Sequence, residues 1–126
     1  MSTSARFTGA TNKDNTGRLV YRDYQTPTYA ASIAVAVKDK AAVTLVAITL
    51  TGALTLTINV GTSSTAPFVG DEILFLIKSD ASIRIVTFST GFQSQGTLVT
   101  VASKTVAATF VFDGTGWQET TRAIQA

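Results

Sequence analysis

Apolar residues alternate with threonine along much of this chain. In residues 53–60 the even positions are Leu, Leu, Ile and Val, and Thr55 and Thr57 stand between them. A period of two is typical of a β-strand with one buried face, because successive side chains point to opposite sides of the strand. The pattern therefore predicts a strand that contributes one apolar face to a protein core.

Similar short patterns recur along the chain, with Gly, Asp, Ser or Lys at the turns between them. The predicted strands are residues 31–37, 43–50, 53–60, 72–78, 82–88, 97–102, 105–112 and 116–119. Two longer loops are predicted at residues 61–70 and 89–96, and no segment has the period of an amphipathic helix. Many short strands with frequent turns predict an all-β fold, an antiparallel β-sandwich or barrel with a jelly-roll-like arrangement.

The predicted strand after the first long loop is apolar on both faces. One face carries Ile73, Phe75 and Ile77, and the other carries Leu74 and Leu76. Such a strand lies either at the centre of one subunit or against another subunit. These five residues are therefore the candidate subunit interface, and a central strand within the monomer is the alternative.

The first 28 residues differ from the rest in being polar, with few apolar side chains. They carry four basic and two acidic residues, so the whole formal net charge of +2 lies in this part of the chain. A segment of this kind does not form a core by itself. We predict an extended N-terminal arm at residues 1–28 and a β-domain at residues 29–126, with a disordered tail as the alternative to a partner-binding arm.

Aromatic and arginine side chains in the arm are suited to anchor it on a partner. The candidate partner-binding residues are Arg6, Phe7, Arg18, Tyr21, Arg22 and Tyr24. We expect the arginines to form charge-assisted hydrogen bonds with acidic neighbours. Residues 19–22 are expected to pair as a short strand with a neighbouring subunit.

The composition excludes several kinds of chemistry. The chain has 126 residues, enough for one domain, and it contains no cysteine and no histidine. Disulfides, thiolate or histidine metal sites and catalysis by a histidine base are therefore excluded, and no cofactor is predicted. Only 14% of the residues are charged, against about 25% in ordinary soluble domains. This favours a surface covered by partners, and a general preference of β-proteins for threonine is the alternative.

The remaining side chains offer little catalytic chemistry. Asp71 and Glu72 are the adjacent acidic pair, but neighbouring strand residues point to opposite faces. A glycosidase needs two carboxylates about 5–10 Å apart across one bond. The pair is better explained as the polar start of a strand, and we predict that the protein is not an enzyme.

Nucleic acid and membrane are not predicted as partners. The basic residues are scattered, and no run of aromatic and basic residues resembles an RNA-binding strand. The apolar stretch at residues 43–60 is interrupted by threonines and by Gly52, so two strands joined by a turn explain it better than a membrane span. The N-terminus lacks the apolar stretch of a signal peptide, which predicts synthesis in the cytoplasm.

Aromatic residues near the loops are candidates for recognition. Phe68 and Phe92 lie in the two long loops and can stack on a sugar or dock into a partner. Trp117 follows the turn at residues 113–116. We predict that its side chain lies in the core, across that turn from the preceding strand.

Residues 107–119 consist of an apolar strand, an Asp-Gly turn and a last strand that bears tryptophan. This ending resembles that of many small β-modules in the virions of tailed bacteriophages. The likeness extends upstream through a threonine-rich strand pair, a Gly-bounded apolar strand at residues 70–78 and a strand ending in Thr87 and Phe88. It covers roughly residues 43–119.

The resemblance implies a homotrimeric virion structural protein without catalytic activity. A capsid decoration (cement) protein typically clamps the capsid lattice with an N-terminal arm, and a chain of this length that begins with an arm favours this placement. We predict that the protein binds the major capsid protein or another virion protein. A tail-fibre or spike module that recognises a glycan through Phe68 and Phe92 is the first alternative, and a trimeric carbohydrate-binding or glycan-cleaving module is the second.

Overall fold

The computed structural model describes residues 21–39, 41–58 and 67–125. Within these residues the chain forms ten strands and no helix. The strands are β1 (Tyr21–Gln25), β2 (Ser32–Val35), β3 (Ala41–Leu50), β4 (Leu54–Ile58), β5 (Glu72–Ser79), β6 (Ile85–Phe88), β7 (Phe92–Gln93), β8 (Leu98–Val99), β9 (Thr105–Phe112) and β10 (Trp117–Ile124).

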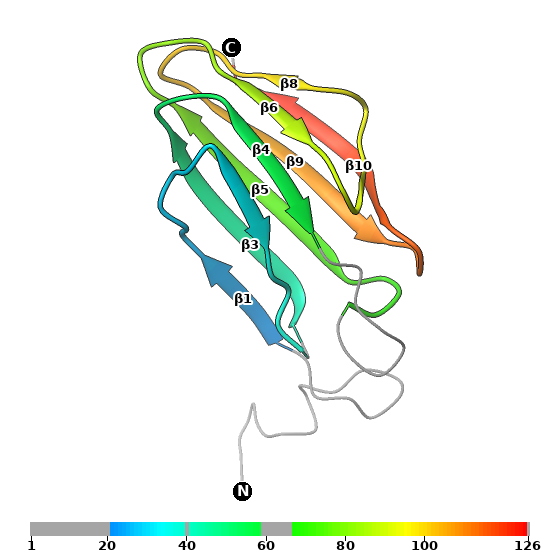
Figure 1. Cartoon of the computed structure of the whole chain (residues 1–126). Coiled ribbons are helices and arrows are strands. Elements are labelled where there is room, and N and C mark those ends of the chain that lie inside the picture. The colour runs from blue at the N-terminus through cyan, green and yellow to red at the C-terminus, as the bar shows by residue number, and fades with distance from the viewer. Residues whose placement is uncertain (1–20, 40, 59–66, 126) are drawn as a thin grey trace, which may run out of the picture.

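The strands form two sheets that pack face to face, as Figure 1 shows. One sheet has six strands in the order β1-β3-β5-β9-β10-β7, and the other has four in the order β2-β4-β6-β8. Apolar side chains of the two inner faces form one buried core, while outward positions alternate with them along each strand. The all-β sandwich expected from the sequence pattern is confirmed.

The predicted antiparallel, jelly-roll-like arrangement is corrected, because both sheets are mixed. β1, β3 and β5 are parallel neighbours in the large sheet, and β2, β4 and β6 are parallel neighbours in the small sheet. The chain crosses to the other sheet after each of these strands. It thus forms three similar coils, β1 with β2, β3 with β4 and β5 with β6, which stack side by side (Figure 1). The antiparallel pairs among the described strands are β5 with β9, β9 with β10 and β6 with β8. Alternation of apolar residues defines a buried face, but it says nothing about the direction of the neighbouring strand.

Four phenylalanines fill the centre of the core. They are Phe75 on β5, Phe88 on β6, Phe92 on β7 and Phe110 on β9. All their ring centroids lie 4.9 to 5.8 Å apart, with tilted or edge-on planes, which is the arrangement that aromatic rings prefer. Because both sheets contribute rings, this cluster joins the two layers.

Trp117 lies in the core, as predicted. Its side chain is fully buried, and its ring centroid is 5.3 Å from that of Phe112, the last residue of β9. The turn between them is closed by Asp113, whose Oδ1 accepts hydrogen bonds from the backbone N–H groups of Thr115 (2.9 Å) and Gly116 (3.0 Å). The Asp-Gly turn thus positions the tryptophan at the start of β10.

β1 lies within the range predicted for the arm, yet it pairs with β3 and belongs to the sandwich. Its inward residues are polar: Asp23 is only 8% exposed and accepts a hydrogen bond from Gln25 Nε2 at 2.8 Å. Lys38 Nζ lies 3.5 Å from the other carboxylate oxygen of Asp23. These groups close the core at the first coil with polar side chains, as terminal repeats of stacked folds commonly do.

Candidate functional site

The predicted interface strand divides between two environments. Ile73, Phe75 and Ile77 of β5 are fully buried in the core of the subunit, so they are not available to a partner. Leu74 and Leu76 point the other way, to the outer side of the six-stranded sheet, where both are half-buried. For the first three residues, the central strand within one subunit is the correct interpretation, and the candidate interface reduces to Leu74 and Leu76.

The outward residues of β1, β3, β5, β9 and β10 line up in four rows across the large sheet, and together they define the outer face. Row 1 contains Arg22, Val43, Glu72, Val111 and Gln118; row 2 contains Tyr24, Leu45, Leu74, Thr109 and Thr121; row 3 contains Ala47, Leu76, Ala107 and Ala123; row 4 contains Thr49, Lys78 and Thr105. The two middle rows contain no charged residue.

The charges of the outer face lie at its two ends. Glu72 and Lys78 stand in row 1 and row 4 of the same strand, and both are exposed. Neither has an ion-pair partner within the described part of the chain. Arg22, which is also exposed, adds a positive charge at the edge of row 1. The face is therefore apolar in the middle and charged at both ends.

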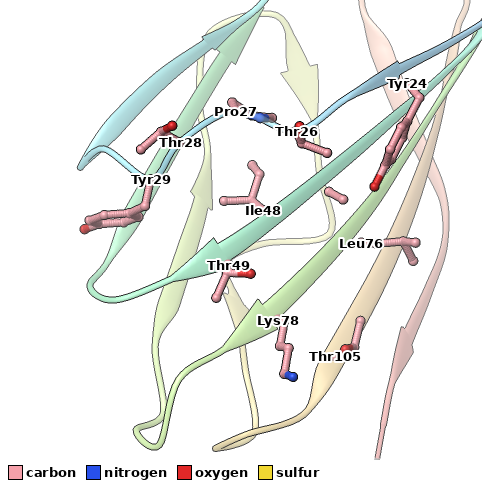
Figure 2. A pocket seen from close by; sticks show the side chains of 11 residues that line it. Tyr24, Thr26, Pro27, Thr28, Tyr29, Ile48, Thr49, Leu76, Lys78 and Thr105 are labelled. Atoms are coloured by element: carbon pink, nitrogen blue, oxygen red, sulfur yellow. The ribbon is translucent and has the colours of Figure 1, made fainter.

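A hollow of about 500 Å³ lies at the row 3 and row 4 end of this face (Figure 2). Its lining includes Ala47 and Leu76, with Tyr24 and Lys78 at its borders and threonines on β3, β9 and the β1–β2 link. Two features create it. β1 ends at Gln25 while β3 continues to Leu50, and Ala47 of row 3 is too short to fill the space beside Leu76.

The predicted arm residues reach this face only in part. Arg22 and Tyr24 lie on β1 at its edge, and Tyr24 is 64% exposed. Tyr21 begins the same strand. Arg6, Phe7 and Arg18 lie outside the described residues. Of the segment 19–22 that we expect to pair with a neighbouring subunit, Tyr21 and Arg22 pair with β3 of the same chain, and residues 19 and 20 lie outside the described residues.

The two aromatic residues predicted for recognition, Phe68 and Phe92, lie in different environments. Phe92 is only 7% exposed and belongs to the central phenylalanine cluster, so its ring cannot stack on a sugar. Its position is set by Gly91, whose φ of +91° turns the chain into β7. Phe68 is half-buried, and its backbone N–H donates to Asp71 Oδ2 at 2.9 Å. The exposed aromatic beside a hollow is Tyr24.

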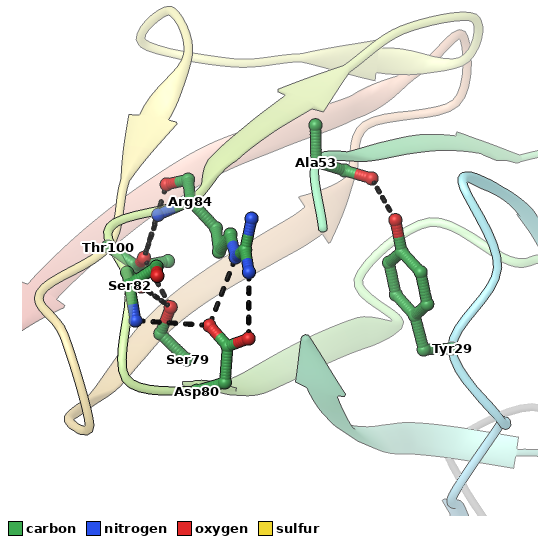
Figure 3. Close-up of polar contacts among 7 residues, drawn as sticks. All are labelled: Tyr29, Ala53, Ser79, Asp80, Ser82, Arg84 and Thr100. Carbon is green, nitrogen blue, oxygen red and sulfur yellow. Dashed lines mark hydrogen bonds and ion pairs between the residues drawn. The ribbon is translucent and has the colours of Figure 1, made fainter. Parts of the chain in front are cut away.

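A second polar cluster holds the β5–β6 turn against β8 (Figure 3). Arg84 binds the Asp80 carboxylate through Nε (3.0 Å) and one terminal nitrogen (2.8 Å), which lowers the pKa of Asp80 and raises that of Arg84. Thr100 Oγ1 accepts a hydrogen bond from the Arg84 backbone N–H and donates one to Ser79 Oγ. Ser79 Oγ in turn donates to the Ser82 carbonyl at 2.6 Å. The hydroxyls of this cluster are engaged in holding the turn.

Tyr29 has a similar structural role in the link between β1 and β2. Its Oη donates a hydrogen bond of 2.7 Å to the carbonyl of Ala53, just before β4 (Figure 3). This bond ties the first coil to the second. Because the ring also borders the hollow, it helps to shape that end of the outer face.

Comparison with known proteins gives no further assignment: no protein-family model matches the chain, and no curated protein matches it. Among the described residues, no acidic side chains gather as a metal site would require. Nor does that part of the chain contain a helix with the length and apolarity needed to cross a membrane. The outer face, with its uncharged middle rows and its hollow, is the candidate functional site.

Proposed function

We propose that this protein is a non-enzymatic structural protein of a bacteriophage virion, and that it coats the head as a decoration protein. The observation that carries the proposal is the outer face, where Leu45, Leu74 and Leu76 form an apolar centre outside a core that is already complete. A structural protein acts through such surfaces, because burying apolar area on contact stabilises an assembly by about 25 cal/mol per Å². The likeness of residues 107–119 to phage virion modules supports the same proposal.

The arm supplies the attachment to the head. Residues 1–20 precede β1, which is the edge strand of the large sheet, so they join the domain beside the outer face. We assign Arg6, Phe7 and Arg18 to contacts with the major capsid protein or another virion protein. Arginine and aromatic side chains are common anchors at protein interfaces.

A tail-fibre or spike module is the second candidate function. The three stacked parallel coils favour it, because repeated coils of this kind extend readily into elongated structures. Its glycan-binding form no longer has the support of Phe92, whose ring is in the core.

Labelling of virions tests the placement directly. Antibodies against the purified protein, coupled to gold, should label the heads of the phage that encodes it in electron micrographs. Label confined to tails would favour the tail-fibre candidate instead. Virions that carry the protein nowhere would overturn both.

Co-sedimentation tests the role of the arm. The full chain should sediment with purified heads, whereas a variant lacking residues 1–20 should remain in the supernatant with an unchanged far-UV spectrum. The deletion stops before Tyr21 because β1 belongs to the sandwich. Equal binding by the truncated variant would contradict the assignment of the arm.

A further inference from the structure

The outer face has charges of opposite sign at equal distances from its centre. Glu72 and Lys78 are exposed on the same side of β5, and they lie six residues, or about 20 Å, apart. The side chains between them on this side are Leu74 and Leu76. A surface with this pattern can bind a second copy of itself if the copy is reversed along the strand direction.

The two middle rows also differ in the length of their outward side chains. Row 2 has long side chains on β1, β3 and β5, namely Tyr24, Leu45 and Leu74. Row 3 has alanines on β3, β9 and β10, and it contains the hollow beside Leu76. The face is thus raised on one side of its centre and recessed on the other, so the same reversal that matches its charges also matches its shape.

We propose, on the basis that the outer face is the contact surface of the proposed function, that a second copy of this chain docks there through a two-fold axis. The axis lies in the plane between the two facing outer faces, one from each copy, and within that plane it runs perpendicular to β5. Row 1 then faces row 4 of the partner subunit, and row 2 faces row 3. Glu72 pairs with the partner's Lys78, and Leu45 lies over the partner's Ala47, at the partner's hollow. A two-fold interface makes each of these contacts twice.

Other symmetric arrangements of this face match it poorly. A two-fold axis parallel to β5 would set Glu72 against the partner's Glu72. A three-fold axis along the strands would gather three Glu72 side chains at one end and three Lys78 side chains at the other. Like charges brought together across an interface cost several kcal/mol. The homotrimer implied by the resemblance would therefore need a different surface.

The area of the outer face indicates a dimer that forms and dissociates reversibly. Five strands about 4.8 Å apart and rows spanning about 20 Å give a plane area of roughly 400 Å², below the roughly 800 Å² of accessible surface per partner in a standard interface. We expect a dimer that forms and dissociates with concentration in the micromolar range, since interfaces of modest area are often of this strength.

Charge reversal tests the pairing through the mass of the full chain in sedimentation velocity. The wild-type protein should approach twice 13.2 kDa at high concentration. Glu72→Lys and Lys78→Glu should each raise the dissociation constant by about tenfold or more, because each places two like-charged pairs in the interface. The double variant Glu72→Lys/Lys78→Glu should dimerise again, and an equimolar mixture of the two single variants should form heterodimers.

Thr87→Lys provides the control, since Thr87 is exposed on β6 of the other sheet. It adds a charge on the opposite side of the sandwich and should leave the dimer unchanged. A wild-type monomer or trimer at high concentration, or single variants that dimerise like the wild type, would overturn the two-fold pairing. Binding to phage heads is measured separately by co-sedimentation. A chain that binds heads but stays monomeric would overturn only the two-fold pairing. A chain that dimerises but binds no heads would overturn only the proposed function.

Discussion

At the scale of single residues, two buried threonines differ in their hydrogen bonds. Thr44 on β3 is fully buried, and its hydroxyl has no hydrogen-bond partner among the described residues. Thr100 is 2% exposed, and its hydroxyl links Arg84 and Ser79. A buried hydroxyl without a partner costs free energy, whereas a bonded one stabilises the fold. The same substitution should therefore have opposite effects at the two sites.

Thr44→Val is expected to raise the free energy of unfolding by about 1 kcal/mol, since a methyl group replaces an unpaired hydroxyl of similar size. Thr100→Val is the matched variant and should lower it by about 1–3 kcal/mol, because two neighbours lose a partner. Urea unfolding followed by tryptophan fluorescence measures both. If Thr44→Val were as destabilising as Thr100→Val, the Thr44 hydroxyl would have an unrecognised partner.

The turn before Trp117 should show an acid-dependent contribution to stability. The backbone N–H groups of Thr115 and Gly116 lower the pKa of Asp113 to about 2, from an ordinary value of 3.8. Because the folded-state pKa is depressed, the contribution is complete above about pH 4 and is lost as the pH falls toward 2. Unfolding measured from pH 5 to pH 2 should therefore be less pH-dependent for Asp113→Asn than for the wild type. Parallel curves would mean that the carboxylate adds nothing specific to the turn.

At the scale of elements, the coils depend on close backbone contacts as well as on apolar faces. Gly91 carries β7 back into the large sheet, and its carbonyl accepts a hydrogen bond of 2.9 Å from the backbone N–H of Trp117. A Cβ at this position would collide with the carbonyl of Ile58 at the end of β4. The glycine therefore permits both the left-handed backbone and the contact between β4 and β7.

Gly91→Ala should lower the free energy of unfolding by about 3 kcal/mol, because it adds a backbone collision to the strain of a positive φ. Gly70 is the control: its φ is +93°, but no atom lies within 4 Å of its Cβ position. Gly70→Ala should cost only about 1 kcal/mol, the strain alone. Thermal or urea unfolding compares the two variants. Equal costs would show that the contact with Ile58 relaxes freely.

At the scale of the whole molecule, the surfaces that stabilise the fold are different from the surface proposed to bind a partner. The inner faces of both sheets are filled by one core that includes the phenylalanine cluster, so folding does not require the outer face. In the proposed pairing, row 2 and row 3 form the contact, and Glu72 and Lys78 at the ends select the orientation of the partner. The charge-reversal experiment addresses this level, since it changes the partner contact and leaves the core untouched.

Much of the local structure could be read from the sequence, whereas the site could be read only in part. The strand at residues 105–112 appears with the predicted bounds, and Trp117 lies in the core, because alternation and turn residues act locally. The sequence pattern predicts a loop at Phe92, because the burial of its ring depends on three rings from distant strands. The sequence pattern also places residues 21–25 in the arm, because the inward Asp23 and Gln25 of β1 are polar and lack the apolar signal of a core strand.

The sequence by itself determined where the long strands such as β3, β5 and β9 lie and which side of each is buried, since a period of two requires nothing beyond neighbouring residues. Only the tertiary structure decided that the first coils run parallel, that β1 joins the sandwich and that Glu72 and Lys78 flank an apolar face. The parallel pairing of the first coils depends on contacts between residues 20 to 32 positions apart, such as Leu45 beside Leu74. Such contacts arise from the packing of the whole core, and no local pattern encodes them.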